Sequence, residues 1–319
     1  MSLQAAPEMI LHHGKVITLD AAFTLAEAVA VENGRILAVG TDDEILKLKG
    51  EGTKLLDLGG KTLMPGLMDS HVHPGSAAMI EFDHEIPTME NIADVLAYLS
   101  ARVKVSKPGD LIGVRQVFIT RLAEKRYPTR AELDTVAPEN PVVFSTGPDS
   151  MLNTAALKLA GIDRHFELPK GSAAKIEKDA SGEPTGLLRS FSPKLSARSV
   201  VRTPTAEDRY KRTRDLFLDY NSVGLTTVAD RDSSPAQTAL YEELLKKGDL
   251  TVRMRVSMGI PAMGLGPATD KALGEITSSP LARPNTDLQI IGTKVYLDGG
   301  MLTGSSYMLE PWGVSEAYG

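Results

Sequence analysis

Two histidines separated by one residue, His71 and His73, follow an apolar stretch that is interrupted only by Pro65-Gly66. Such a stretch is typical of a buried strand, from whose end the two imidazoles would emerge. Because side chains alternate along a strand, both rings would point to the same face. Two neutral imidazoles on one face can hold a divalent cation, most often zinc. Two ordinary histidines at a strand end are the alternative that the spacing alone leaves open.

A lysine, Lys294, interrupts a second apolar stretch, which runs over residues 288–297. A lysine that points into an apolar core is costly unless it is paired or chemically altered. A salt bridge to Asp298 or to another carboxylate is one solution, and chemical modification of the amine is the other.

The composition of the 319-residue chain narrows the classes of function. Its net charge of −6 argues against a nucleic-acid-binding surface, which needs a basic patch. No apolar stretch reaches the ~18 residues of a membrane span. The chain has no cysteine, which excludes disulfides, thiolate metal sites and a cysteine nucleophile. No signal pattern is present, so a cytoplasmic location is the default, although Met1-Ser2-Leu3 could replace a removed leader.

The elements that must position these residues begin with a small β domain. Residues 1–63 contain short apolar runs separated by turns, of which Asn33-Gly34 is a strong hairpin signal. Thr41 to Glu44 has the pattern of a capping box that begins a short helix. We expect a small β-sandwich here, with His12 and His13 on one strand and facing opposite sides, which would prevent them from binding one metal ion together.

The rest of the chain, residues 64–319, alternates between strands and helices after residue 203. With the strand that ends at His73, four βα units result, and this pattern implies a parallel sheet. Residues 74–200 are too long for one crossover and are interpreted as an insertion that covers the site. Four units would leave two exposed edges, whereas a closed TIM-type (β/α)8 barrel has eight strands. The sequence therefore predicts an α/β fold that contains the first half of such a barrel and lacks its C-terminal half.

The segment from Met64 to His73 closely resembles the Pro-Gly…Asp-x-His-x-His strand that opens the barrel of the amidohydrolase superfamily of metal-dependent hydrolases. Four further stretches are similar to its YtcJ-like branch, which includes N-substituted formamide deformylase: residues 128–134, 153–162, 224–228 and 292–300. The resemblance implies that His71, His73 and Lys294 are metal ligands. It also implies that Lys294 takes part in catalysis and is commonly carboxylated to a carbamate that can hold two ions.

The resemblance implies further site residues. The family supplies two more histidines and an aspartate from later strands, but no histidine follows His165 in this sequence. Asp149 occupies a position where many relatives carry a histidine that faces the substrate, and a simple turn residue is the alternative. Asp230 and Arg231 end a predicted strand, where they would orient substrate or form an internal ion pair. With Asp298, these three are the candidate substrate-binding residues.

The function expected from these observations is metal-dependent hydrolysis of a carbon–nitrogen bond other than a peptide bond, in an amide or formamide. One or two zinc ions would lower the pKa of a bound water to about 7. Deamination within the same superfamily is the second hypothesis, and a metal-poor, inactive binding protein is the third. The expected partners are a small-molecule substrate and, in a homodimer, a second copy of the chain, with no nucleic acid and no membrane.

Overall fold

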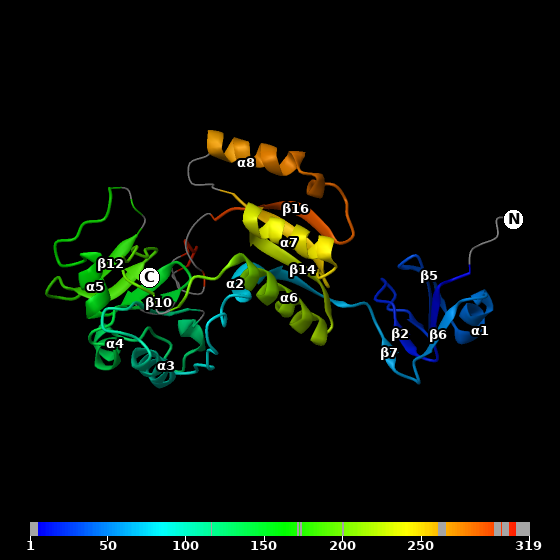
Figure 1. Cartoon of the computed structure of the whole chain (residues 1–319), viewed down its shortest axis with the longest axis horizontal. Helices are drawn as coiled ribbons and strands as arrows, with labels where there is room; N and C mark the ends of the chain where they lie inside the picture. The colour runs from blue at the N-terminus through cyan, green and yellow to red at the C-terminus, as the bar shows by residue number, and fades with distance from the viewer. Residues whose placement is uncertain are drawn as a thin grey trace. The chain divides into compact units, whose positions relative to one another are not determined.

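The computed structural model of the chain describes residues 6–115, 117–170, 172, 174–199, 201–260, 266–296, 301 and 306–310. The chain, drawn in Figure 1, divides into two compact units. The first unit comprises Met1–His71, Phe217–Ala229 and Thr251–Met254. The second comprises Val72–Leu216, Asp230–Leu250 and Arg255–Gly319.

The N-terminal region contains two small sheets. Their strand orders are β5-β4-β1-β6 and β3-β2-β7. The side chains of Ile10, Ala28, Ala30 and Ile45 form a small buried cluster. The elements are β1 (Met9–His12), β2 (Lys15–Ile17), β3 (Leu25–Ala26), β4 (Ala28–Glu32), β5 (Arg35–Gly40), α1 (Asp42–Ile45), η1 (Leu46–Leu48), β6 (Lys54–Asp57) and β7 (Thr62–Leu63). The sandwich packing of these sheets stays a prediction.

Local signals in this region are confirmed, with one correction. Asn33 and Gly34 have φ values of 50° and 69° and join the antiparallel strands β4 and β5. Thr41 and Glu44 form the predicted capping box. However, β1 ends at His12, and His13 has a left-handed φ of 54°. The prediction that strand geometry keeps the two imidazoles apart is therefore wrong, and their ring centroids are 4.6 Å from each other.

The expected insertion contains a five-stranded sheet of order β12-β13-β11-β10-β9. Helix α3 packs its apolar side chains into the largest buried cluster of this part, which includes Val95, Leu99 and Phe144. Figure 1 shows α3, α4 and α5 beside this sheet. The bounds are α3 (Ile92–Lys104), β9 (Ile112–Val114), η2 (Ile119–Arg121), α4 (Arg130–Val136), β10 (Val142–Thr146), β11 (Asp149–Leu152), α5 (Thr154–Ala160), β12 (Lys175–Lys178) and β13 (Pro184–Arg189).

The remaining strands form a four-stranded sheet of order β16-β15-β14-β8. Leu67 N donates to Gly224 O at 2.9 Å and Ile260 N to Lys294 O at 3.0 Å, so like ends of neighbouring strands meet, as in parallel pairing. The elements are β8 (Leu67–Val72), α2 (Pro74–Ala77), α6 (Ala206–Ser222), β14 (Leu225–Ser233), α7 (Pro235–Lys247), β15 (Arg253–Gly259), α8 (Pro267–Ser278), η3 (Pro280–Ala282) and β16 (Leu288–Lys294).

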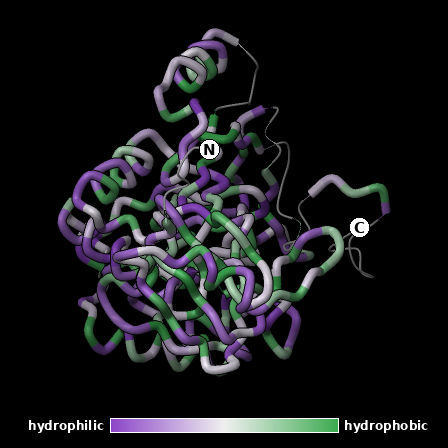
Figure 2. The backbone as a smooth tube through the Cα atoms, turned by 90° about the vertical axis from the view of Figure 1, so that its right-hand side faces the viewer, coloured by the Kyte–Doolittle hydropathy of each residue, from purple (hydrophilic) through white to green (hydrophobic). Residues whose placement is uncertain are grey.

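The fold class is α/β, as expected. In the part of the chain that the structure describes, β8 and β16 are the two ends of an open sheet, so the closed eight-stranded barrel stays a prediction. Figure 2 shows hydrophobic and hydrophilic residues alternating in short stretches along the backbone. Accordingly, none of the described helices is both long and apolar enough to cross a bilayer.

The capping box of α4 provides a test of this part of the fold. Arg126 donates to both carboxylate oxygens of Glu132 at 2.8 Å, and Thr129 N donates at 2.6 Å. The bonds from Arg126, followed by those from Thr129, lower the pKa of Glu132 from 4.5 to about 2. Because the pKa is lower in the folded protein, the resulting stability is present above pH 4.5 and is lost as the pH falls towards 2.

We therefore expect Glu132→Gln, which preserves the cap, to lower the free energy of unfolding by about 0.5–1 kcal/mol at pH 7. The difference from wild type should shrink progressively below pH 4.5 in urea titrations, since 4.5 is the ordinary pKa of the carboxyl. Glu139→Gln, an exposed change on the same segment, is the matched control and should have little effect at either pH. An effect of Glu132→Gln that does not change with pH would contradict the assigned role of the ion pair.

Candidate active site

A buried carboxylate, Asp230, lies near the carboxyl end of β14. The residue is 2% exposed. Its Oδ2 accepts a hydrogen bond of 2.9 Å from the hydroxyl of Tyr241, which is fully buried on α7. Its Oδ1 accepts from Asp232 N at 3.2 Å. These bonds fix the carboxylate in one orientation, in which Oδ1 lies 3.9 Å from Nδ1 of His73.

His73 comes directly after β8 and precedes the first residue of α2. The proline at position 74 suits the first position of a helix, where its missing N–H is not needed. The carbonyl of His73 accepts from Ala77 N at 3.0 Å and from Ser76 Oγ at 3.3 Å. The backbone of His73 is thus fixed by the helical turn, while its ring is 45% exposed and lies beside Asp230.

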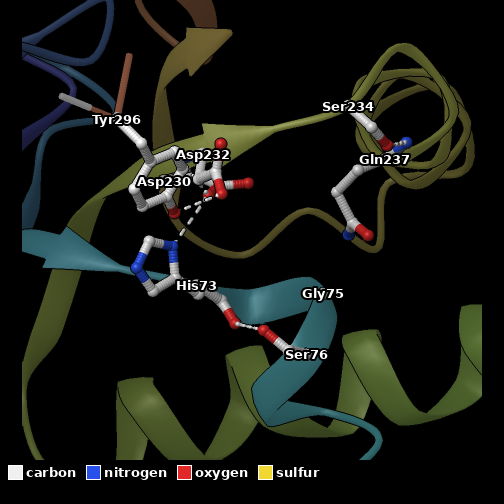
Figure 3. Close-up of a pocket in the computed structure, with 8 residues that line it drawn as sticks. All are labelled: His73, Gly75, Ser76, Asp230, Asp232, Ser234, Gln237 and Tyr296. Atoms are coloured by element: carbon white, nitrogen blue, oxygen red, sulfur yellow. Dashed lines mark hydrogen bonds and ion pairs between the residues drawn. The ribbon is translucent and has the colours of Figure 1, made fainter. Parts of the chain in front are cut away.

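His73 and Asp230 line a pocket of about 280 Å³. Figure 3 shows the ring of His73 directed at Asp230, with Gln237 of α7 and Ser234, the residue that caps this helix, to the right. The described lining contains two carboxylates and one imidazole but no lysine or arginine. It consists of His73, Gly75, Ser76, Asp230, Asp232, Ser234, Gln237 and Tyr296.

Asp232 and Tyr296 form the second polar pair of the pocket. The Tyr296 hydroxyl donates to Asp232 Oδ2 at 2.7 Å. This bond, together with burial and the charge of the carboxylate, raises the pKa of Tyr296 to about 12. The phenol is therefore protonated at neutral pH and acts as a donor. Nζ of Lys294 lies 4.9 Å from the centroid of the Tyr296 ring, so this lysine is next to a wall of the pocket.

Two glycines allow the walls of the pocket to approach closely. A Cβ at Gly75 would lie 2.0 Å from Gln237 Oε1, and a Cβ at Gly259 would lie 2.4 Å from Asp232 Oδ1. Any larger residue would displace one of these polar side chains. The two glycines therefore help to position the polar groups that line the pocket.

The sequence-predicted residues are distributed unevenly around this pocket. Lys294 is the last residue of β16 and is half-buried. Arg231 lies between the two aspartates on β14 and donates to Ser257 Oγ at 3.2 Å, and the described pocket lining does not include it. His71 belongs to the other compact unit, where its N–H donates to Asp69 Oδ1 at 2.9 Å.

Asp149 lies in the insertion rather than in the lining of the pocket. It is 1% exposed, and its Oδ1 accepts from Ser190 N at 2.8 Å. Its Oδ2 lies 3.3 Å from both Arg189 Nη1 and the Tyr127 hydroxyl. These bonds stabilise the sheet of the insertion, and contact with substrate stays a prediction. Asp298 lies outside the described residues.

Sequence reasoning missed several groups that line the pocket or hold its carboxylates. Asp232 could have been found, because residues two apart on a strand share a face and Asp230 was already a candidate. The rings of Tyr241 and Tyr296 come from a helix and from the end of a distant strand, so only the folded chain brings them to these carboxylates.

The donor set of the pocket suits a divalent cation. One imidazole and two carboxylates are ordinary ligands for zinc and for related ions, and the described lining offers no positive charge to compete. Among the described residues, a group of three His, Asp or Glu side chains whose metal-ligand atoms lie within 4.8 Å of one another occurs once, at His12, His13 and Asp57, which are not in this pocket. The pocket described here therefore supplies part of a ligand set.

Comparisons with known proteins agree with this chemistry. A sequence model described as "Amidohydrolase family" matches residues 54–316. N-substituted formamide deformylase from Arthrobacter pascens is 33% identical over 77% of this chain and 46% of its own length. The putative amidohydrolase YtcJ from Bacillus subtilis is 29% identical over 56% of this chain and 34% of its own. The chain thus spans about half the length or less of these two relatives.

A solved structure supports the fold alone. An uncharacterized metal-dependent hydrolase from Pyrococcus furiosus aligns with a TM-score of 0.55 and 18% identity, over 95% of this chain and 59% of the other. The match of the family model over most of the chain, with the similarity to the two curated relatives, shows that the chain belongs to the amidohydrolase family, in the branch that includes N-substituted formamide deformylase and YtcJ.

Proposed function

We propose that this chain carries part of the active site of a metal-dependent hydrolase that cleaves a carbon–nitrogen bond other than a peptide bond. The observation that carries the proposal is the pairing of His73 with the buried Asp230, 3.9 Å apart in an acidic pocket at the carboxyl ends of the strands. In βα folds, catalytic groups come from these strand ends. The family membership and the similarity to a formamide deformylase favour an amide or a formamide as substrate.

The metal ligands in this proposal are His71, His73 and Lys294, with Lys294 carboxylated and zinc as the ion. A bound divalent cation would polarise the substrate carbonyl and lower the pKa of a water to about 7. The position of Lys294 supports this role, because its Nζ lies against Tyr296, which lines the pocket. Conversion of its amine to a carbamate would replace a positive charge with a negative one and would add a metal-binding group next to the pocket that His73 lines.

The chain's own residues would order this site. Asp230 is a positioning residue, since it is fixed by Tyr241 and lies beside the ring of His73. A carboxylate at the second nitrogen of a metal-binding imidazole fixes the orientation of the ring and raises its basicity. Tyr296, protonated at neutral pH, fixes Asp232 on the other wall and leaves the second oxygen of that carboxylate for substrate.

The organisation of the chain is part of the same proposal. We propose a separate β domain in residues 1–63, and in residues 64–319 four strands of an eight-stranded barrel that is interrupted by an insertion at about 74–200. The open four-stranded sheet and the separate five-stranded sheet support this division. A small-molecule substrate, a homodimer and a cytoplasmic location complete the proposal.

The first test removes an imidazole. His73→Ala should reduce zinc bound at micromolar free metal by about one equivalent and abolish release of carboxylate from N-substituted formamides, because a ligand is lost. His165→Ala, an exposed histidine in the insertion, is the matched control and should change neither. Unchanged zinc content and activity after His73→Ala would refute the proposed site. Release of ammonia from a heterocycle by the wild type would instead identify a deaminase.

The second test separates positioning from ligation. Asp230→Asn keeps an acceptor for Tyr241 and removes the charge beside His73, so we expect a 10–100-fold loss of zinc affinity. Tyr241→Phe should produce a smaller loss in the same direction, because the carboxylate remains but is less well oriented. Competition with a chromophoric chelator gives both affinities. Equal zinc affinities of Asp230→Asn and the wild type would show that this carboxylate does not influence zinc binding by His73.

A further inference from the structure

A second group of metal-ligand side chains lies at the end of β1 in the N-terminal region. One donor atom from each of His12, His13 and Asp57 lies within 4.8 Å of the other two. The parallel pairing of β1 with β6 places His12 directly opposite Asp57. The left-handed backbone at His13 then turns the second ring towards the same point. The cluster therefore follows from strand register together with one backbone turn.

The rings and the carboxylate are already arranged for a shared ligand. The planes of the two imidazoles are inclined at 71°, with the ring centroids 4.6 Å apart. His13 Nδ1 lies 3.4 Å from Asp57 Oδ2. The other oxygen of Asp57 accepts from Gly59 N at 2.8 Å, which directs Oδ2 towards the histidines. Ligand atoms around a tetrahedral zinc ion are about 3.4 Å apart, so only small side-chain rotations are needed.

A second carboxylate orients the ring of His13. Asp42 Oδ1 accepts from His13 N at 2.8 Å, and its Oδ2 lies 3.7 Å from Nε2 of the same ring. Metal-binding histidines commonly direct their second ring nitrogen to a carboxylate, which fixes the tautomer. With Nε2 directed at Asp42, the lone pair of Nδ1 is the one available beside Asp57.

The ring of His12 has an unmet need for a partner. Its Nδ1 is buried and has no hydrogen-bond partner among the described residues, whereas buried polar atoms are normally paired. The backbone around it is fixed, because His12 O accepts from Leu58 N at 2.8 Å and His13 O from Gly60 N at 2.7 Å. A cation bound by the cluster would order this ring without any change in the backbone.

We propose that His12, His13 and Asp57 form a second metal site, distinct from the proposed catalytic one, which binds Zn²⁺ through two imidazoles and one carboxylate. Imidazole nitrogen together with carboxylate oxygen selects zinc and neighbouring transition metals rather than calcium or magnesium. Because the ligands come from β1, the residue that follows it and β6, the bound ion ties two strands of one sheet together. The site uses none of the residues proposed for catalysis.

The test uses the full chain with the proposed catalytic ligands removed by His71→Ala and His73→Ala. After equilibrium dialysis against micromolar Zn²⁺, elemental analysis should find about one zinc ion per chain. Addition of His12→Gln and His13→Asn should abolish this binding, and asparagine tolerates the left-handed backbone at residue 13. Addition of His165→Asn instead, as the matched control, should leave it unchanged. A background chain that binds no zinc overturns the proposal without bearing on the catalytic one.

A milder variant tests the carboxylate. Asp57→Asn in the same background keeps an oxygen for Gly59 N and removes the charged ligand. We expect zinc affinity to fall at least about tenfold and the zinc-induced rise in unfolding temperature to shrink accordingly. The same affinity and the same rise as in the background chain would overturn the proposed ligand set.

Discussion

The candidate active site depends on one buried negative charge. In the described part of the chain, the hydrogen-bond donors to Asp230 are the hydroxyl of Tyr241 and the backbone N–H of Asp232, and both are neutral. Neutral donors satisfy the lone pairs of a carboxylate but do not cancel its charge, which is costly at 2% exposure. A positive charge on the side of His73, 3.9 Å away, would offset this cost. In the proposed function, the metal ion bound by this imidazole and the other ligands would supply that charge.

The structure around Asp230 serves this arrangement. Tyr241 of helix α7 fixes one carboxylate oxygen of Asp230. The second carboxylate on β14, Asp232, is fixed by Tyr296, which follows the last residue of β16 by two positions. Glycines at 75 and 259 allow the walls to close around these groups. The described lining of this pocket contains two carboxylates and no lysine or arginine, which suits a cation and a polar substrate better than an anionic one.

Local signals in the sequence predicted most of the elements, because they depend only on nearby residues. The capping box at Thr41 and the turn at Asn33-Gly34 are present as expected. The arrangement of His12 and His13 could not be predicted, because it depends on a backbone conformation at His13 that is uncommon for a non-glycine residue.

The composition of the site was predictable only in part. The motif located His73 and the strand period could have added Asp232, whereas Tyr241 and Tyr296 reach the carboxylates through tertiary packing that no local pattern encodes. Asp149 shows the reverse case. The pattern placed this carboxylate near substrate, which stays a prediction, but it did not show that the side chain contacts the guanidinium of Arg189 and the N–H of Ser190.

A crystal structure of the zinc-loaded protein, with anomalous data collected at the zinc edge, tests the proposed metal site most directly. The expected result is an anomalous peak between His71, His73 and Lys294 on the pocket side of Asp230, with extra density on the lysine amine that fits a carbamate. A pocket without an anomalous peak, in crystals grown with zinc, and without extra density on the Lys294 amine would contradict the proposed site.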